Sequence, residues 1–180
     1  VPFVIAAALA SVPAPSPETS AQSVTAVRSW AVSRSFVPQG DEVSALPAAG
    51  VTGEFRKIDA EPNGLLELHR HVPVPPKSRV TAGVARVAIR ANAAGNYAFD
   101  LGFSDIATVF LNGRPVFRGD ATYTFGRPRR GGLNGYDQAR LYLPLSAGNN
   151  DLSIVVSDVF GGWGIMGRFV GAQGLTIEAR

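Results

Sequence analysis

The two histidines of the chain, His69 and His71, lie two positions apart, and Glu67 lies two positions before His69. Leu66 and Leu68 alternate with these residues, which predicts a β-strand with one polar and one apolar face. Residues two apart on a strand sit about 6.5–7 Å from each other on one face, so two imidazoles and a carboxylate can bind one metal ion. This pattern makes the three residues a candidate metal site for a small metal-dependent hydrolase. The alternative is the ordinary polar face of a strand.

A second candidate site is the irregular stretch 123–137, which mixes aromatic, arginine, amide and carboxylate side chains on a glycine-rich backbone. An aromatic ring can cover the C–H face of a sugar while Arg, Asn and Asp side chains bond its hydroxyls. The residues expected to contact a ligand are Tyr123, Arg127, Arg129, Arg130, Asn134, Tyr136 and Asp137. The arginines favour an acidic glycan over a neutral one.

Trp163 is the remaining candidate for the ligand surface, because glycines flank it at Gly161, Gly162 and Gly164. An aromatic ring on such a glycine-rich segment could add a second flat surface for a sugar. The alternative is structural: the ring closes an end of the fold, and the glycines let other backbone pass close by.

Signals for covalent catalysis are few. The chain has no cysteine, which excludes thiol nucleophiles and thiolate zinc sites, and it has no Gly-x-Ser-x-Gly elbow. Asp105 and Asp158 stand at the ends of predicted strands, where Asp commonly accepts a backbone amide in a turn. The sequence leaves open whether the chain is an enzyme and favours a non-catalytic role.

Alternation of apolar and polar residues predicts the scaffold for these sites. It recurs around 24–36, 66–72, 85–90, 97–103, 107–111, 141–145, 152–157 and 175–178. Asn112-Gly113 interrupts one such run, and this pair is the strongest short signal for a hairpin because both turn positions need φ > 0. No window predicts a long amphipathic helix. These features predict an all-β fold, an antiparallel β-sandwich or jelly roll, with residues 23–180 as one domain.

The first ten residues form an uncharged apolar run that ends in Ala8-Leu9-Ala10. This is typical of the end of a secretory signal peptide, and residues 11–22 follow as a Pro/Ser/Ala linker. The alternative is an apolar N-terminal strand. Ten apolar residues are too few to cross a bilayer, so we expect no transmembrane segment and a secreted or periplasmic location.

The low net charge and the scattered basic residues do not favour nucleic acid as a partner. The formal net charge is +3, and the basic residues are scattered apart from the arginines at 127–130. A nucleic-acid site would need a basic stripe with interleaved aromatic rings.

With the strands placed, three segments resemble galactose-binding-domain-like jelly rolls, the β-sandwich modules found beside glycoside hydrolases and related secreted enzymes. Residues 102–113 resemble their D-x-A-x-V-x-x-N-G hairpin. Residues 143–156 are similar to their L-x-L-x-x-G-x-N-x-L-x-V-x-V segment, and 160–164 to the glycine-rich, aromatic end that follows. The resemblance covers about residues 79–170 well. It implies the jelly-roll fold and leaves function open, because members range from sugar binders to spacers.

The resemblance also implies that a structural calcium ion is worth considering. Oxygen ligands for it occur in 134–137 and in the turn 149–151, but neither segment has the spacing of a defined calcium loop, and the alternative is ordinary turn residues. The sequence therefore predicts an exported, non-catalytic module that binds carbohydrate or another cell-envelope ligand through its end loops, beside other secreted enzymes. A small metal-dependent hydrolase and a structural or partner-docking module are the alternatives.

Overall fold

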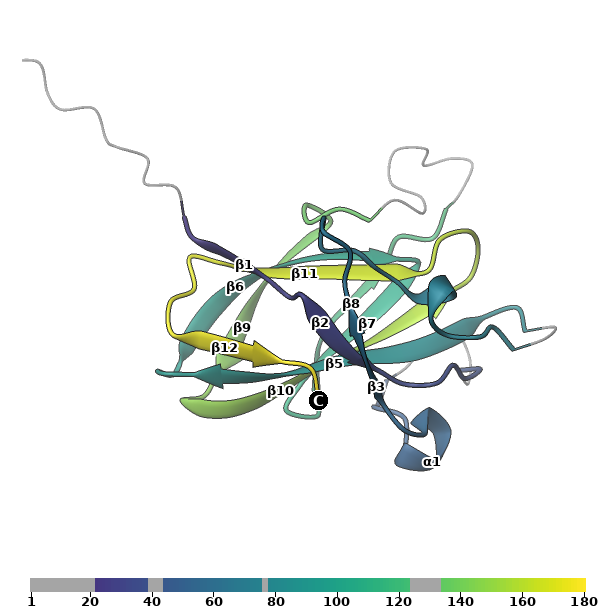
Figure 1. The fold of residues 1–180 in the computed structure, drawn as a ribbon, viewed down its shortest axis with the longest axis horizontal. Helices are drawn as coiled ribbons and strands as arrows, with labels where there is room; N and C mark the ends of the chain where they lie inside the picture. The colour runs from purple at the N-terminus through teal and green to yellow at the C-terminus, as the bar shows by residue number, and fades with distance from the viewer. Residues whose placement is uncertain (1–21, 39–43, 76–77, 124–133) are drawn as a thin grey trace, which may run out of the picture.

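A computed structural model describes residues 22–38, 44–75, 78–123 and 134–180. Two antiparallel sheets pack face to face, which Figure 1 shows edge-on. The elements are β1 (Val24–Ala26), β2 (Ser29–Val32), α1 (Ala49–Thr52), β3 (Arg56–Asp59), β4 (Leu66–Glu67), the 3-10 helix η1 (Leu68–Arg70), β5 (Thr81–Ala91), β6 (Gly95–Ser104), β7 (Ile106–Leu111), β8 (Arg114–Asp120), β9 (Ala139–Leu145), β10 (Gly148–Asp158), β11 (Gly164–Val170) and β12 (Leu175–Glu178). The predicted signal segment 1–10 and all but the last residue of the linker 11–22 lie outside the described residues.

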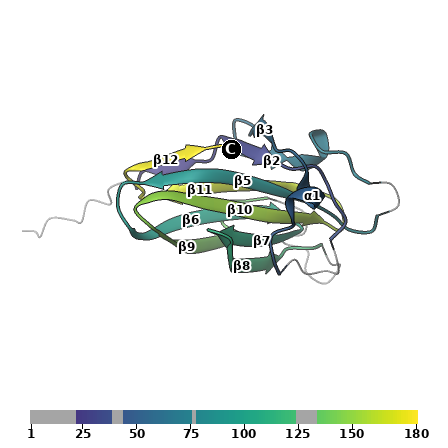
Figure 2. The same ribbon diagram turned by 90° about the horizontal axis from the view of Figure 1, so that it is seen from below.

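The two sheets confirm the predicted all-β antiparallel sandwich. The five-stranded sheet has the order β1-β11-β6-β9, with β4 also paired to β11. The seven-stranded sheet has the order β3-β2-β5-β10-β7-β8, with β12 also paired to β5. Figure 2 looks onto the seven-stranded sheet and shows α1 in front of its outer face. Every strand pair in both sheets is antiparallel.

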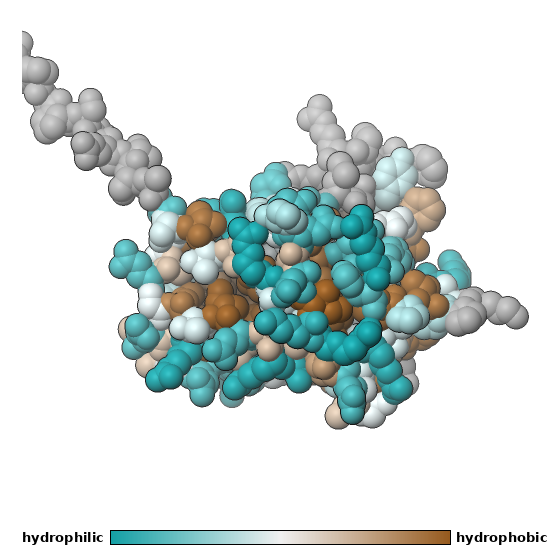
Figure 3. All heavy atoms as spheres, viewed as in Figure 1, coloured by the Kyte–Doolittle hydropathy of each residue, from teal (hydrophilic) through white to brown (hydrophobic). Residues whose placement is uncertain are grey.

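Alternation along the long central strands places one face in the core. In β5, Val87 and Ile89 are buried between the sheets, while Arg86 and Arg90 point to the outer side. The same register buries Leu152 of β10 opposite Val87. The surface seen edge-on is mostly hydrophilic, with small separate hydrophobic patches (Figure 3). No helix among the described residues is long and apolar enough to cross a membrane.

The predicted hairpin at Asn112-Gly113 is confirmed. The turn joins β7 and β8, and its two residues have φ values of 51° and 77°. Both φ values are positive, as a tight primed turn requires. The Asn112 side chain also ties the turn to β10, because its Oδ1 accepts the backbone N–H of Asp151 at 2.8 Å.

The alternating run over 24–36 does not form one continuous strand. The chain leaves the five-stranded sheet after β1, where Val24–Ala26 pair with β11, and enters the seven-stranded sheet as β2. Phe36 forms only an isolated bridge with Ala82 and packs on the outer side of the seven-stranded sheet. Changing sheets requires a break in pairing that a continuous apolar pattern does not reveal.

Candidate functional site

The connection between β10 and β11 carries the most exposed large aromatic side chain at its end of the described sandwich. Phe160 is 66% exposed. The glycine that follows it, Gly161, has φ 98°, which favours glycine over any residue with a Cβ. A short turn thus presents the ring of Phe160 to solvent at the end where β8 also terminates.

Asp105 fixes this turn. Its carboxylate is 0% exposed, and Oδ2 accepts the backbone N–H groups of Val159 at 2.8 Å and Phe160 at 2.7 Å. The hydroxyl of Ser104 donates to Oδ1 at 3.1 Å. The backbone carbonyl of Asp105 accepts the N–H of Ala121 at 2.7 Å. One residue therefore holds the turn after β10 and the chain after β8 together, and the turn role predicted for Asp105 is confirmed.

Tyr123 lies beside Phe160, with ring centroids 6.2 Å apart and ring planes tilted by 33°. Tyr123 is the last described residue before the segment 124–133. The two rings come from the ends of different strands of the seven-stranded sheet, β8 and β10. They form an aromatic pair that is half-buried on the Tyr123 side and exposed on the Phe160 side.

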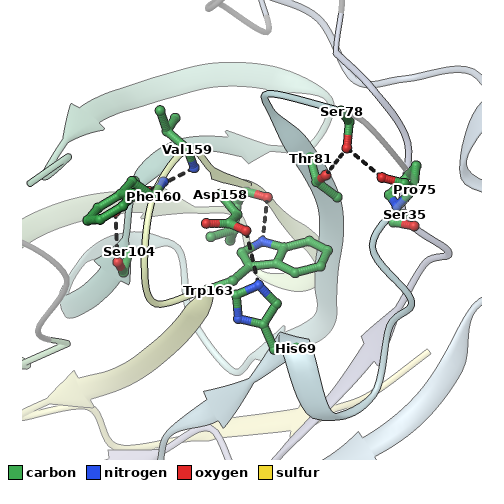
Figure 4. A network of polar contacts seen from close by, with 12 residues as sticks. Ser35, His69, Pro75, Ser78, Thr81, Ser104, Asp158, Val159, Phe160 and Trp163 are labelled. Carbon is green, nitrogen blue, oxygen red and sulfur yellow. Dashed lines mark hydrogen bonds and ion pairs between the residues drawn. The ribbon is translucent and has the colours of Figure 1, made fainter.

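A histidine–carboxylate pair supports the same turn from the inner side. Nε2 of His69 lies 3.0 Å from Oδ2 of Asp158, and the imidazole packs edge-on against Trp163 with centroids 5.6 Å apart (Figure 4). Burial raises the pKa of the Asp158 carboxyl, and the neighbouring His69 opposes that shift. Oδ1 of Asp158 is buried without a hydrogen-bond partner among the described residues.

The structure does not bring Glu67, His69 and His71 together. The predicted strand over 66–72 is wrong beyond Glu67, because the chain turns into η1 at Leu68. Glu67 instead pairs with Arg70, whose Nε is 2.7 Å from Oε2. No cluster of three or more His, Asp or Glu side chains that could hold a metal ion occurs in the described part of the chain.

A nucleophile–histidine pair is also absent from the described residues. His69 makes its side-chain hydrogen bond to Asp158. The hydroxyls of Ser78 and Thr81, drawn nearby in Figure 4, bond to each other at 2.9 Å. Ser78 also donates to the carbonyl of Pro75. Both hydroxyls therefore serve the local turn, and His69 has no hydrogen bond to a hydroxyl of the described residues.

Trp163 lies in the core rather than on the ligand surface. Its side chain is 1% exposed, and its Nε1–H donates to the carbonyl of Val156 at 3.0 Å. Gly83 lies against its ring, since a Cβ there would be 3.2 Å from Cζ2. The tryptophan takes the structural alternative, and the exposed ring of this turn belongs to Phe160, three residues earlier.

The C-terminal base of the long loop is anchored on the five-stranded sheet. The side chain of Gln138 bonds both backbone groups of Phe103, accepting from N–H at 2.7 Å and donating to the carbonyl at 3.0 Å. Gly135 packs directly over Gly102. The ring of Tyr136 lies 4.4 Å from the guanidinium carbon of Arg168.

Of the predicted ligand residues in the long loop, those at 134–137 lie at its C-terminal base. Asn134 is half-buried beside Gly164, and Tyr136 is half-buried, so that burial raises the pKa of its phenol. Tyr136 therefore helps to fix the loop through its contact with Arg168, and Asn134 lies against Gly164. Asp137 belongs to the same base and also makes contacts of its own. Arg127, Arg129 and Arg130 lie outside the described residues.

The two predicted calcium segments differ in how their side chains are used. In the turn 149–151, the Asn150 amide accepts from the N–H of Ser146 and donates to the carbonyls of Ser146 and Gly148, so this side chain shapes the turn. In 134–137, Oδ1 of Asn134 is buried without a partner among the described residues. Calcium takes six to eight oxygen ligands, so one such oxygen leaves calcium binding a prediction.

Asp100 fastens the strands beneath the loop base. Its carboxylate is 3% exposed and meets Nε of Arg140 at 2.6 Å and Nε of Arg168 at 3.0 Å. The hydrogen bond from Arg140 is the main cause that lowers the pKa of Asp100, burial opposes it, and Arg168 adds to the lowering. One carboxylate thus joins β6 to both of its neighbours, β9 and β11.

Replacing Asp100 with Asn is expected to lower the free energy of unfolding at pH 7 by about 1–3 kcal/mol, because two arginines lose their anion. The folded-state pKa of Asp100 is lowered, so its contribution is present above the ordinary pKa and is lost as pH falls through the lowered value. Urea denaturation should therefore show the gap between wild type and D100N closing below pH 4. Asp151→Asn, which breaks the exposed pair with Arg180, is the control. An equal loss in both variants would contradict this role for Asp100.

Comparisons with known proteins yield likenesses in fold only. No protein-family model matches the sequence, and no curated protein matches it. Similar solved structures include a family 35 carbohydrate binding module from an environmental isolate, at 20% identity and TM-score 0.38, covering 54% of this chain and 71% of that one. A beta-glucosidase from Kluyveromyces marxianus is 15% identical with TM-score 0.48, covering 83% of this chain and 15% of the enzyme. A GH2 beta-galacturonidase from Eisenbergiella tayi is 14% identical with TM-score 0.47, covering 82% and 24%.

These identities and scores do not say what the chain binds. The antiparallel sandwich itself is consistent with the galactose-binding-like fold that the sequence resembles. The chain spans less than a quarter of the length of both enzymes. Any ligand must therefore be argued from the residues of this chain.

Proposed function

We propose that the chain is an exported, non-catalytic module that binds carbohydrate through the end of the sandwich where Tyr123 and Phe160 meet. The observation that carries the proposal is the exposed ring of Phe160 on a turn that Asp105 holds by two backbone amides. Sugars bind to such rings through their C–H faces. A fixed turn supports affinity because little conformational entropy is lost on binding.

The proposal substitutes Phe160 for Trp163 as an aromatic contact and keeps the predicted ligand surface around Tyr123. Phe160 takes the platform role for which Trp163 is a candidate in the sequence, and Tyr123 keeps its own. Arg127, Arg129 and Arg130 continue the same segment beyond Tyr123 in the sequence, so an acidic glycan remains the favoured ligand class. Export is supported by the apolar run 1–10, and other secreted enzymes are the expected company of such a module.

Phe160→Ala is expected to weaken glycan binding about tenfold, the usual cost of removing an aromatic anchor. A glycan array that includes neutral and acidic polysaccharides would identify a ligand for wild type, and calorimetry would compare the variants. Tyr142→Ala is a matched control, because Tyr142 is 67% exposed but stands on β9 of the other sheet. Equal losses in the two variants, or an array blank for wild type, would overturn the proposal.

A further inference from the structure

A groove crosses the outer face of the seven-stranded sheet, away from the turn that carries Phe160. Its volume is about 660 Å³, within the range of small-molecule sites. The floor comes from β2, β5 and β10, and the walls come from the segment around α1 and from the last two residues. Figure 2 shows α1 in front of these strands. The lining residues that matter below are Lys57, Ala31, Arg86, Ser153, Phe55 and Glu54.

The strand register sets two cations on opposite sides of a small side chain. Lys57 of β3 pairs with Ala31 of β2, and Ala31 pairs with Arg86 of β5. Neighbouring strands lie about 4.8 Å apart, so the Cα atoms of Lys57 and Arg86 are about 10 Å apart. Both long side chains can reach an anion held over Ala31. On the other side of Arg86, the register places the small side chain of Ser153.

The guanidinium of Arg86 is positioned for such an anion. It lies over the ring of Phe55, with its central carbon 3.6 Å from the ring centroid. Its Nε donates to the backbone oxygen of Arg180, the last residue of the sequence, at 2.6 Å. No Asp or Glu side chain in 22–38, 44–75, 78–123 or 134–180 forms an ion pair with Arg86 or Lys57. A stacked, half-buried arginine that faces no side-chain carboxylate can donate from its two terminal amino groups to the carboxylate of a ligand.

The other lining residues suit a ring with hydroxyl groups. Leu46, Pro47 and Val84 give the groove an apolar wall for the face of a ring. The carboxylate of Glu54 and the hydroxyls of Thr52 and Ser153 supply acceptors and donors. Glu54 also disfavours an anion at its own end of the groove, which directs the charge of a ligand toward Arg86 and Lys57.

We propose that this groove is a second binding site, for a small cyclic carboxylate, and that it is separate from the carbohydrate surface at Phe160. The carboxylate lies over Ala31 between Arg86 and Lys57, and the ring packs on the apolar wall. A sugar acid and an aromatic acid share this chemistry.

The test is a titration of isotope-labelled protein, followed by NMR, with glucuronate, 4-hydroxybenzoate and neutral glucose up to about 10 mM, which detects affinities as weak as about 1 mM. We expect shifts at groove residues with at least one acid and none with glucose. Glucuronate alone would assign a sugar acid, 4-hydroxybenzoate alone an aromatic acid, and both the general class. No shifts with either acid, or equal binding of glucose, would overturn the proposal.

Arg86→Met keeps much of the stacked side chain without the charge and is expected to weaken binding about tenfold, and Lys57→Met less. Arg90→Met is the matched control, because Arg90 is exposed on the same face of β5 but does not line the groove. If Arg86→Met failed to fold stably, Lys57→Met and the salt dependence of acid binding to wild type would still test whether the groove binds the carboxylate through these cations. Unchanged binding in both variants would overturn the site. Phe160→Ala should leave acid binding in the groove intact, so this site and the proposed carbohydrate surface can fail separately.

Discussion

Asp105→Ala is expected to lower the free energy of unfolding by about 3 kcal/mol, because the backbone amides of Val159 and Phe160 lose a charged acceptor. For a domain of this size, that loss lowers Tm by roughly 6–12 °C. Asp105→Asn retains one acceptor oxygen in the same place and should cost about 1 kcal/mol. The order of the two variants separates the loss of hydrogen bonds from the loss of charge. Thermal and urea denaturation measure both.

The same pair of variants tests whether the turn must be held for binding. Asp105→Ala releases Phe160, so glycan affinity should fall in that variant while Asp105→Asn keeps most of it. Asp120→Ala is the control: its carboxylate also accepts a backbone amide, that of Thr122 at 2.9 Å, but in an exposed turn, and should cost below about 1 kcal/mol. An Asp105→Ala protein within about 1 kcal/mol of wild type would contradict the anchoring role.

The parts of this fold that local chemistry determines could be predicted from the sequence. Alternation in β5 and β10 follows from burial of one sheet face, and Asn112-Gly113 marks a turn because both residues need positive φ. Asp105 could be recognised as a turn residue from its place at a strand end. Each of these inferences depends on neighbours within a few positions along the chain.

The parts that were missed depend on distant partners. His69 was placed on a strand by parity, yet its chain segment turns into η1, and its side chain meets Asp158, 89 positions away. The sequence leaves both a platform role and a structural role open for Trp163, because residue type and flanking glycines do not show which aromatic ring packs into the core. The position of Phe160 shortly after a strand is a signal for a turn, but only the hydrogen bond that its backbone N–H donates to Asp105, 55 positions away, shows how that turn is held.

The groove on the seven-stranded sheet also could not be predicted from the sequence, because residues far apart in the chain form it. Arg86 reads as an ordinary solvent-facing residue in an alternating strand. Its position opposite Ala31 depends on the pairing of two strands in which these residues lie 55 positions apart in the sequence. The ring of Phe55 that supports it comes from the irregular segment between β2 and β3. Strand register and loop path together create the candidate site, and neither is encoded in the local alternation.

Gly102→Ala is expected to detach the base of the long loop and to cost about 1–3 kcal/mol, the usual range for overpacking. A Cβ at residue 102 would lie 2.5 Å from the carbonyl oxygen of Gly135 and 2.8 Å from its nitrogen. Backbone cannot yield as a flexible side chain does, so Gly135 must move. Its movement should loosen the bonds of Gln138 to Phe103.

Tyr136 provides a local readout of that movement. Burial raises the pKa of its phenol, so release of the loop base by Gly102→Ala should shift its ionisation down toward the ordinary value, seen by ultraviolet titration with Tyr136→Phe to assign the signal. Gly95→Ala on the same strand is the control, because a Cβ there meets only Tyr97 at an ordinary 3.6 Å. A Gly102→Ala protein with unchanged stability and unchanged Tyr136 titration would mean that the loop does not depend on this contact. Loss of both, together with weaker glycan binding, would show that the sheet positions the loop through one glycine.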